Sequence, residues 1–279
     1  MASASYRFQL GEFELLIVKD GTSGHRRLSD LVDDLPGDLS HREIFMEGGL
    51  MVIDTPNVRF LLDGGNGPYR RPRTHVAETA FEEEGITPQS IDTILLTHGD
   101  PDHICGLLTK DGELVYPNAH YVLNIDLWRA LSSDPDSGLY FAGQSDFVRR
   151  LSHLIQGRST LLEAEREIWP GVRAIPALGH RAGHTIYRFD SQGAVLFHIG
   201  DTAFDPIFLE RPDLLLPTEY KPAQAQLTRA ALARRLVAED ALIVGSHFDV
   251  ANVGRLKRSE NSDHYHWIRQ SLANLGTNS

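Results

Sequence analysis

Short apolar runs in this chain end in polar residues that could carry chemistry. The predicted strand Ile91 to Leu96 leads directly into Thr97-His98-Gly99-Asp100-Pro101-Asp102-His103. A short apolar run predicts a buried strand, and the polar cluster after it predicts a loop at the strand's end. Burying so many polar groups is costly unless they are hydrogen-bonded or bind an ion. The pattern therefore predicts a site built on this loop.

The remaining pattern predicts a mixture of strands and helices. Strands are expected at 6–10, 12–18, 48–54, 58–63, 119–124, 167–169, 172–178, 184–189, 194–199 and 241–245. Helices are expected at 74–85, 102–108, 125–131, 146–156, 223–238 and 263–275. Strands precede helices in each half, which predicts two similar sheet-and-helix halves rather than a parallel βαβ series.

Several connecting segments have a composition typical of turns and loops. Asp20-Gly21 predicts a turn, and 25–40 predicts a surface loop. The glycine-rich stretch Asp63 to Pro68 favours a tight backbone approach to the His98 loop over a phosphate cradle, because no Gly-Lys-Ser/Thr follows it. We expect an insertion at 132–157. Its apolar tip is compatible with either a substrate-contacting lid or an ordinary anchored loop.

Three further polar clusters also follow predicted strands. They are Gly179-His180-Arg181-Ala182-Gly183-His184, Gly200-Asp201-Thr202 and Ser246-His247. Strand ends on one rim of a sandwich can direct loop residues toward a common point. A single buried histidine is usually a hydrogen-bonded core residue, but four such clusters in this order are a strong signal of a shared site.

These clusters resemble the metal-binding motifs of the metallo-β-lactamase superfamily, which are H-x-H-x-D-H, G-H-T-x-G-H, G-D and a late histidine. The resemblance covers most of the chain. The opening strands, the 48–67 hairpin and Thr228-Arg229 look most like the branch of acyl-homoserine lactonases and methyl parathion hydrolase. It implies an α+β fold, a four-layer αββα sandwich of two mixed β-sheets flanked by helices, forming a single domain over 1–279.

The resemblance also implies a binuclear metal site. The matching residues are His98, Asp100 and His180 for one ion, Asp102, His103 and His247 for the other, and Asp201 as the bridge. Two divalent ions about 3.5–4 Å apart can share a water and lower its pKa toward neutrality, so that hydroxide becomes the nucleophile. The implied catalytic residues are Asp201, which bridges, and Asp102, which orients the hydroxide or passes a proton to the leaving group.

Asp100 and Phe204 depart from the family pattern. Asp100 replaces the second histidine of the first motif, so an anionic oxygen on a shorter side chain replaces a neutral nitrogen. Zinc is the expected metal, but oxygen-rich ligation shifts preference toward manganese or iron. Phe204 stands where lactonases of this branch often carry a substrate-binding tyrosine, and Tyr140 or Tyr220 is a candidate replacement.

Composition narrows the choice of partners and location. The formal net charge is −11 and the basic residues are scattered, which argues against nucleic acid. No apolar run approaches the ~18 residues of a membrane span. With no signal-peptide pattern and a single cysteine, Cys105, we expect a cytoplasmic protein. Cys105 is expected to be a small core residue, and His184 to hydrogen-bond behind the ligands.

The expected function is a dinuclear metal-dependent hydrolase of a small ester or lactone. A phosphotriesterase or phosphodiesterase could use the same ligands. Asp100 also leaves open a non-catalytic family member that only binds metal. The expected partner is a small-molecule substrate, and the pattern leaves open whether the chain forms a homodimer.

Overall fold

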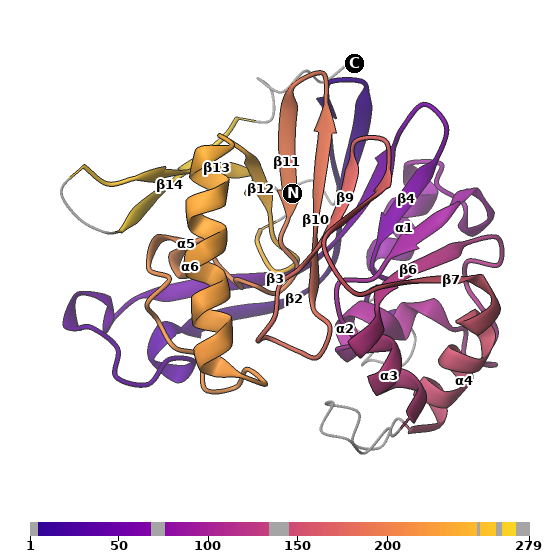
Figure 1. Cartoon of the computed structure of the whole chain (residues 1–279), viewed down its shortest axis with the longest axis horizontal. Coiled ribbons are helices and arrows are strands. Elements are labelled where there is room, and N and C mark those ends of the chain that lie inside the picture. Colours follow the sequence, from indigo (N-terminus) through magenta and orange to yellow (C-terminus); the bar gives the residue numbers. More distant parts are fainter. Residues whose placement is uncertain (1–4, 68–75, 134–144, 250–251, 261–263, 272–279) are drawn as a thin grey trace.

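Two seven-stranded sheets pack face to face, and helices cover their outer faces (Figure 1). The computed structural model describes residues 5–67, 76–133, 145–249, 252–260 and 264–271. In spatial order the first sheet is β1 (Ser5–Leu10), β2 (Phe13–Arg27), β3 (Glu43–Asp54), β4 (Arg59–Leu62), β5 (Thr93–Leu95), β6 (His120–Asn124) and β7 (Ser159–Leu162). The second is β14 (Tyr265–Arg269), β13 (Gly254–Arg258), β12 (Leu242–Val244), β11 (Ala194–His198), β10 (Thr185–Ser191), β9 (Val172–Pro176) and β8 (Arg166–Trp169).

The helices form the two outer layers. Those of the first half are α1 (Val76–Glu83), α2 (Pro101–Ile104), α3 (Ile125–Ser133) and α4 (Ser145–Ile155), and those of the second are α5 (Ile207–Glu210) and α6 (Pro222–Ala238). Short 3-10 turns lie at Leu28–Asp30, Gly37–Leu39, Pro88–Ser90, Cys105–Leu107 and Gln156–Arg158. The α+β sandwich is thereby confirmed. No helix in the described ranges has both the length and the apolar character needed to cross a bilayer.

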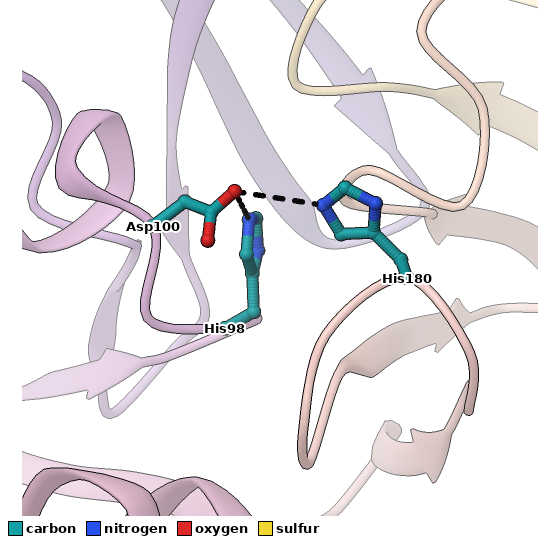
Figure 2. Close-up of side chains that lie close together, drawn as sticks. All are labelled: His98, Asp100 and His180. Atoms are coloured by element: carbon teal, nitrogen blue, oxygen red, sulfur yellow. Dashed lines mark ion pairs between the residues drawn. The ribbon is translucent and has the colours of Figure 1, made fainter. Parts of the chain in front are cut away.

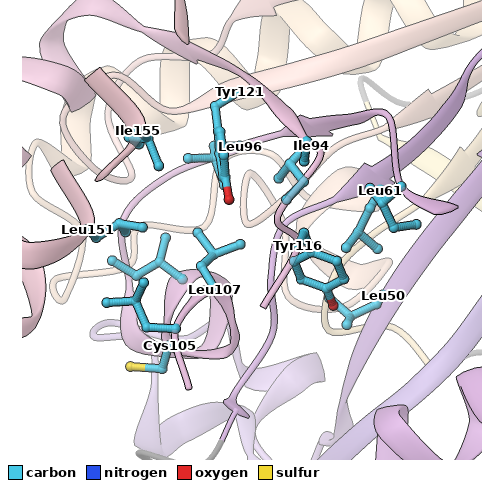
Figure 3. Packing of buried hydrophobic residues seen from close by; sticks show 14 of the residues in the cluster. Leu50, Leu61, Ile94, Leu96, Cys105, Leu107, Tyr116, Tyr121, Leu151 and Ile155 are labelled. Carbon is cyan, nitrogen blue, oxygen red and sulfur yellow. The ribbon is translucent and has the colours of Figure 1, made fainter. Parts of the chain in front are cut away.

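Side-chain alternation along the strands explains the four layers. In β2, Leu15 and Ile17 point between the two sheets, where they join residues of both sheets. Leu16 and Val18 point the other way, into a core shared with α1, α3 and α4. Figure 3 shows part of this core, with Leu151 and Ile155 of α4 among its residues. Successive strand residues face opposite sides, so a strand buried on both faces is apolar throughout. A third core lies between the second sheet and α5 and α6.

The expectation that the halves contain no parallel βαβ series was wrong for the first half. Strands β4, β5, β6 and β7 pair in parallel, and β11 pairs in parallel with β12. Helices lie in the connections between these strands, and parallel neighbours require such crossovers. The remaining strand pairs are antiparallel, so both sheets are mixed.

Two local predictions were also wrong. The predicted turn at Asp20-Gly21 lies within β2. The pairing register of β2 with β3 shifts after Lys19, as in a β-bulge. At this irregularity the buried Asp20 side chain accepts a hydrogen bond from Asn66. The predicted helix at 263–275 is β14 over its described part. Tyr265 is buried and Trp267 packs on the same core, so the apolar residues alternate with period two, as in a strand.

The predicted insertion is described only in part. Residues 134–144, which include Tyr140, lie outside the described residues, as does the predicted helix start at Thr74. The following helix α4 packs in the first core through Val148, Leu151 and Ile155. The described part of 132–157 is therefore a component of the helical layer.

Candidate metal centre

The four predicted clusters meet at one rim of the sandwich. His98 follows β5, His180 follows β9, Asp201 follows β11 and His247 follows β12. The loops that carry His98 and His180 are joined directly, because the Thr185 N–H donates to the Thr97 carbonyl across the sheets at 2.8 Å. Each loop starts from a buried strand, so a rigid scaffold sets its position.

The first group consists of His98, Asp100 and His180 (Figure 2). The Asp100 Oδ2 atom lies 3.7 Å from His98 Nε2 and 3.8 Å from His180 Nε2. One carboxylate oxygen thus faces two imidazole nitrogens that come from opposite sheets. These separations are too long for hydrogen bonds and leave room for an ion among the three atoms.

The second group consists of Asp102, His103 and His247. Asp102 Oδ2 lies 3.7 Å from His247 Nε2. Pro101 at the start of α2 fixes the turn that carries Asp102 and His103 toward the rim.

Asp201 lies between the two groups. Its Oδ2 is 3.7 Å from His98 Nε2 and 3.6 Å from His180 Nε2, and its Oδ1 is 3.4 Å from His103 Nε2. His247 Nε2 lies 3.1 Å from Oδ2. The structure therefore brings all seven predicted ligands together in the predicted division, with Asp201 central; that each binds an ion stays a prediction.

Unsatisfied nitrogen and oxygen atoms show that this centre suits a cation. The Nε2 atoms of His98, His103 and His180 and the Oδ1 atom of Asp201 are buried without a hydrogen-bond partner in the described part of the chain. Buried polar atoms normally have a hydrogen-bond partner, so several such atoms without one in the same small region need an explanation. Imidazole and carboxylate are good ligands for zinc, manganese and iron, and the residues present fit such ions.

The electrostatics agree with a cation site. Burial alone would raise the pKa of Asp201, but the neighbouring histidines, first His247 and then His103, hold it well below its usual value. Burial and the nearby His98 lower the pKa of His180 well below its ordinary value. Burial lowers the pKa of His103, yet Asp201 and Asp63 raise it well above the usual value overall. The same carboxylates favour a positive charge at this point, and a metal ion bound to His103 would take the place of a ring proton.

Asp63 supports the His98 loop, and its role was not identified from the sequence. Its carboxylate accepts bonds from the Thr97 backbone N–H and hydroxyl at 2.7 Å each, and lies 2.8 Å from His103 Nδ1. Burial would raise the pKa of Asp63, but His103 lowers it. Such a partner fixes the ring's orientation and would direct Nε2 toward a bound ion. The signal was the aspartate at the end of β4, one strand from His98.

Replacing Asp63 with alanine should weaken zinc binding by ~10–100-fold, as is typical when an outer partner of a ligand is lost. Titration of metal-free protein against a chromophoric chelator measures the change. Asp54→Ala is the matched control, because it removes an aspartate of the same sheet that pairs with Arg59 instead. Unchanged zinc affinity in a folded Asp63→Ala protein would contradict this role.

The glycine-rich loop approaches the metal loop closely, as expected. The Gly64 N–H donates to the His103 carbonyl at 2.6 Å, and Gly106 N–H donates to the Gly65 carbonyl at 2.9 Å. A Cβ on Gly106 would lie 1.9 Å from the Gly64 carbonyl oxygen. A side chain there would force the two backbones apart, so glycine is required for this contact.

A buried ion pair lies behind His180 and was also missed. Arg229 on α6 donates from Nη1 to Glu219 Oε1 at 2.8 Å, and Glu219 Oε1 lies 4.0 Å from His180 Nδ1. Burial raises the pKa of Glu219 to about 7, although Arg229 opposes the shift. Arg229 matched the family branch in sequence, but its contact with Glu219 depends on how α6 packs against the second sheet.

Other expectations can be compared with the structure directly. His184 Nε2 accepts the Asp201 N–H at 3.0 Å, so it hydrogen-bonds behind the ligands. Cys105 is fully buried in the first core (Figure 3), as expected of a core residue. Phe204 packs edge-on against His180 and His247, with ring centroids 5.5 and 5.6 Å apart.

Solved structures similar to this fold include AidC, a dizinc quorum-quenching lactonase in complex with a product N-hexanoyl-L-homoserine. It is 20% identical, with a TM-score of 0.83 over 96% of this chain and 98% of that one. Hydrolase AbOPH of the beta lactamase superfamily is 23% identical, with a TM-score of 0.82 over 97% and 98%. A probable metal-dependent hydrolase from Staphylococcus aureus is 19% identical, with a TM-score of 0.74 over 94% and 98%.

The family itself is identified from the sequence. No curated protein matches the chain. The model of the metallo-beta-lactamase superfamily matches residues 50–247, which includes all the candidate ligands. The matched region covers most of the chain, and the fold and order of its strand-end loops agree with it. The chain therefore belongs to the metallo-beta-lactamase superfamily.

Proposed function

We propose that this protein is a dinuclear metal-dependent hydrolase that cleaves a small ester or lactone, with zinc as its metal. The observation that carries the proposal is the central position of Asp201 between the two ligand groups, each with buried nitrogen atoms that lack a hydrogen-bond partner among the described residues. The lactonase named among similar structures holds two zinc ions, which supports the same metal here.

The candidate residues would have two roles, which are to hold the metal ions and to transfer protons. A pair of divalent ions at this centre would polarise the substrate's carbonyl oxygen and make a water nucleophilic at neutral pH. His98, Asp100 and His180 would hold one ion, and Asp102, His103 and His247 the other. The Asp102 side chain is 25% exposed and that of Asp201 is 4% exposed, so Asp102 is the carboxylate better placed to exchange protons. We infer that Asp102 takes the water's proton and delivers it to the leaving-group oxygen.

Residues beside the centre favour a substrate with an apolar part. Phe204 is half-buried against His180 and His247 and offers an apolar face but no hydroxyl. Tyr220 is 53% exposed, and its backbone N–H donates to the His180 carbonyl at 3.0 Å. Tyr220 therefore lies next to the His180 loop and is our candidate for the hydroxyl that Phe204 lacks.

Hydrolysis of a substrate panel tests the proposal. Protein loaded with zinc, manganese or iron should hydrolyse lactones and aryl esters faster than aryl phosphotriesters and bis-aryl phosphates, and a chelator should abolish turnover. Faster phosphate-ester cleavage would instead assign the phosphotriesterase alternative. Absence of turnover by every metal-loaded form would support a binding protein and overturn the proposal.

A further inference from the structure

Arg181 contacts the ligand that departs from the family pattern. Its Nε donates to Asp100 Oδ1 at 2.8 Å and to Oδ2 at 2.9 Å, and both side chains are buried. In the second family motif this position is a threonine, whereas Arg181 is a long cation. Two departures that are 81 residues apart in sequence therefore meet at one point.

The guanidinium is also tied to the backbone around it. Nη1 donates to the His180 carbonyl at 2.7 Å and to the Thr218 carbonyl at 3.3 Å. These bonds fix Arg181 independently of Asp100. The fixed guanidinium can then orient the short aspartate side chain, whose Oδ2 faces the His98 and His180 nitrogens.

The pairing of Asp100 with Arg181 also affects the net charge of the metal centre. A histidine ligand is neutral, but an ionised aspartate adds a negative charge to a centre that already contains Asp102 and Asp201. Arg181 supplies the compensating positive charge within hydrogen-bonding distance of that aspartate. Asp100 and Arg181 together thus carry the same net charge as the neutral histidine that they replace, and they retain one ligand atom.

We propose that Arg181 is a positioning residue that makes Asp100 a working ligand in place of histidine, so that the two act as one unit. The inference rests on the proposed metal centre. By itself, Asp100→His would offer zinc a neutral nitrogen ligand and would be expected to raise zinc affinity. With Arg181 present, that substitution leaves a buried cation facing the first ion without its carboxylate, and binding should weaken.

A double-mutant cycle measures the coupling. The four proteins are the wild type, Arg181→Ala, Asp100→His and the double variant. Zinc dissociation constants come from chelator competition. Anomalous diffraction measures zinc occupancy beside His98 and His180. Arg188→Ala is the control, since this arginine of neighbouring β10 pairs with Glu239 and Asp190 instead. Thermal melting of each metal-free protein tests folding.

We expect the effect of Arg181→Ala on zinc affinity to have opposite signs in the Asp100 and Asp100→His backgrounds. In the Asp100 background, Arg181→Ala should weaken first-site zinc binding by ~10–100-fold. In the Asp100→His background it should strengthen binding. The zinc affinity of the Arg181→Lys protein should lie between those of the wild type and the Arg181→Ala protein, because lysine keeps the charge but not the planar group. If the Arg181→Ala protein does not fold, Arg181→Lys takes its place in the cycle. Equal effects of Arg181→Ala in both backgrounds would overturn the inference alone. Wild type that binds no zinc would overturn the metal centre as well.

Discussion

Asp201→Ala is expected to leave room for only one metal ion and to reduce hydrolysis by more than ~100-fold, beyond the ~10–100-fold typical when a residue hydrogen-bonded to a metal ligand is lost. The reason is its position. Its two oxygens face His98 and His180 on one side and His103 on the other, at 3.4 to 3.7 Å. Without this carboxylate, each proposed ion would lose a ligand and the negative charge between the two groups would be removed.

Metal analysis and turnover of the purified variant measure this loss together. Asp205→Ala is the matched control, because Asp205 belongs to the same loop but accepts the Ile207 N–H rather than facing the histidines. We expect Asp205→Ala to retain both metals. An Asp201→Ala protein with two ions and normal turnover would show that Asp201 is not the bridge.

Arg229→Ala is expected to lower the free energy of unfolding by about 3–5 kcal/mol, the cost of removing one partner from a buried ion pair. The Arg229 side chain is 0% exposed and that of Glu219 is 1% exposed. Arg229 also donates to the Leu214 carbonyl at 2.7 Å. The substitution leaves Glu219 buried without its cation, behind His180, and opens a cavity under α6.

Urea unfolding of the metal-free protein measures this change without a contribution from metal binding. The control is Arg149→Ala, whose pair with Asp146 is exposed, with 61% of the arginine side chain accessible. Exposed pairs contribute about 0–1 kcal/mol, so the control should unfold almost as the wild type does. Equal stability of the Arg229→Ala and Arg149→Ala proteins would contradict a structural role for the buried pair.

The candidate ligands could be predicted because each stands in a local pattern. His98, His180, Asp201 and His247 each follow an apolar run, and the order of these clusters resembles one family. The residues that support them could not be recognised in the same way, although Asp63 follows β4 directly and Arg181 lies next to His180. Asp63, Glu219 and Arg181 are single polar residues whose partners lie 10 to 81 residues away in sequence. Only the packing of strands and helices shows which charge each one meets.

Most of the architecture was likewise predictable from apolar runs, and the errors have physical causes. The long strand β2 contains an irregularity near Asp20. In the sequence this position looks like a turn, because Asp-Gly is a turn signal. β14 is short and ends near the C-terminus, so a few apolar residues fitted a helix as well as a strand. Its pairing with β13 resolves the ambiguity. Short apolar runs are ambiguous in this way until the neighbouring element is known.

Anomalous diffraction from crystals grown with zinc tests the central claim most directly. We predict two peaks about 3.5–4 Å apart. The first should lie about 2.0–2.2 Å from its nitrogen and oxygen ligands in His98, Asp100 and His180, and the second at the same distance from Asp102, His103 and His247. Asp201 should contact both. A centre without an anomalous peak, or peaks bound elsewhere in the chain, would contradict a dinuclear site at this rim.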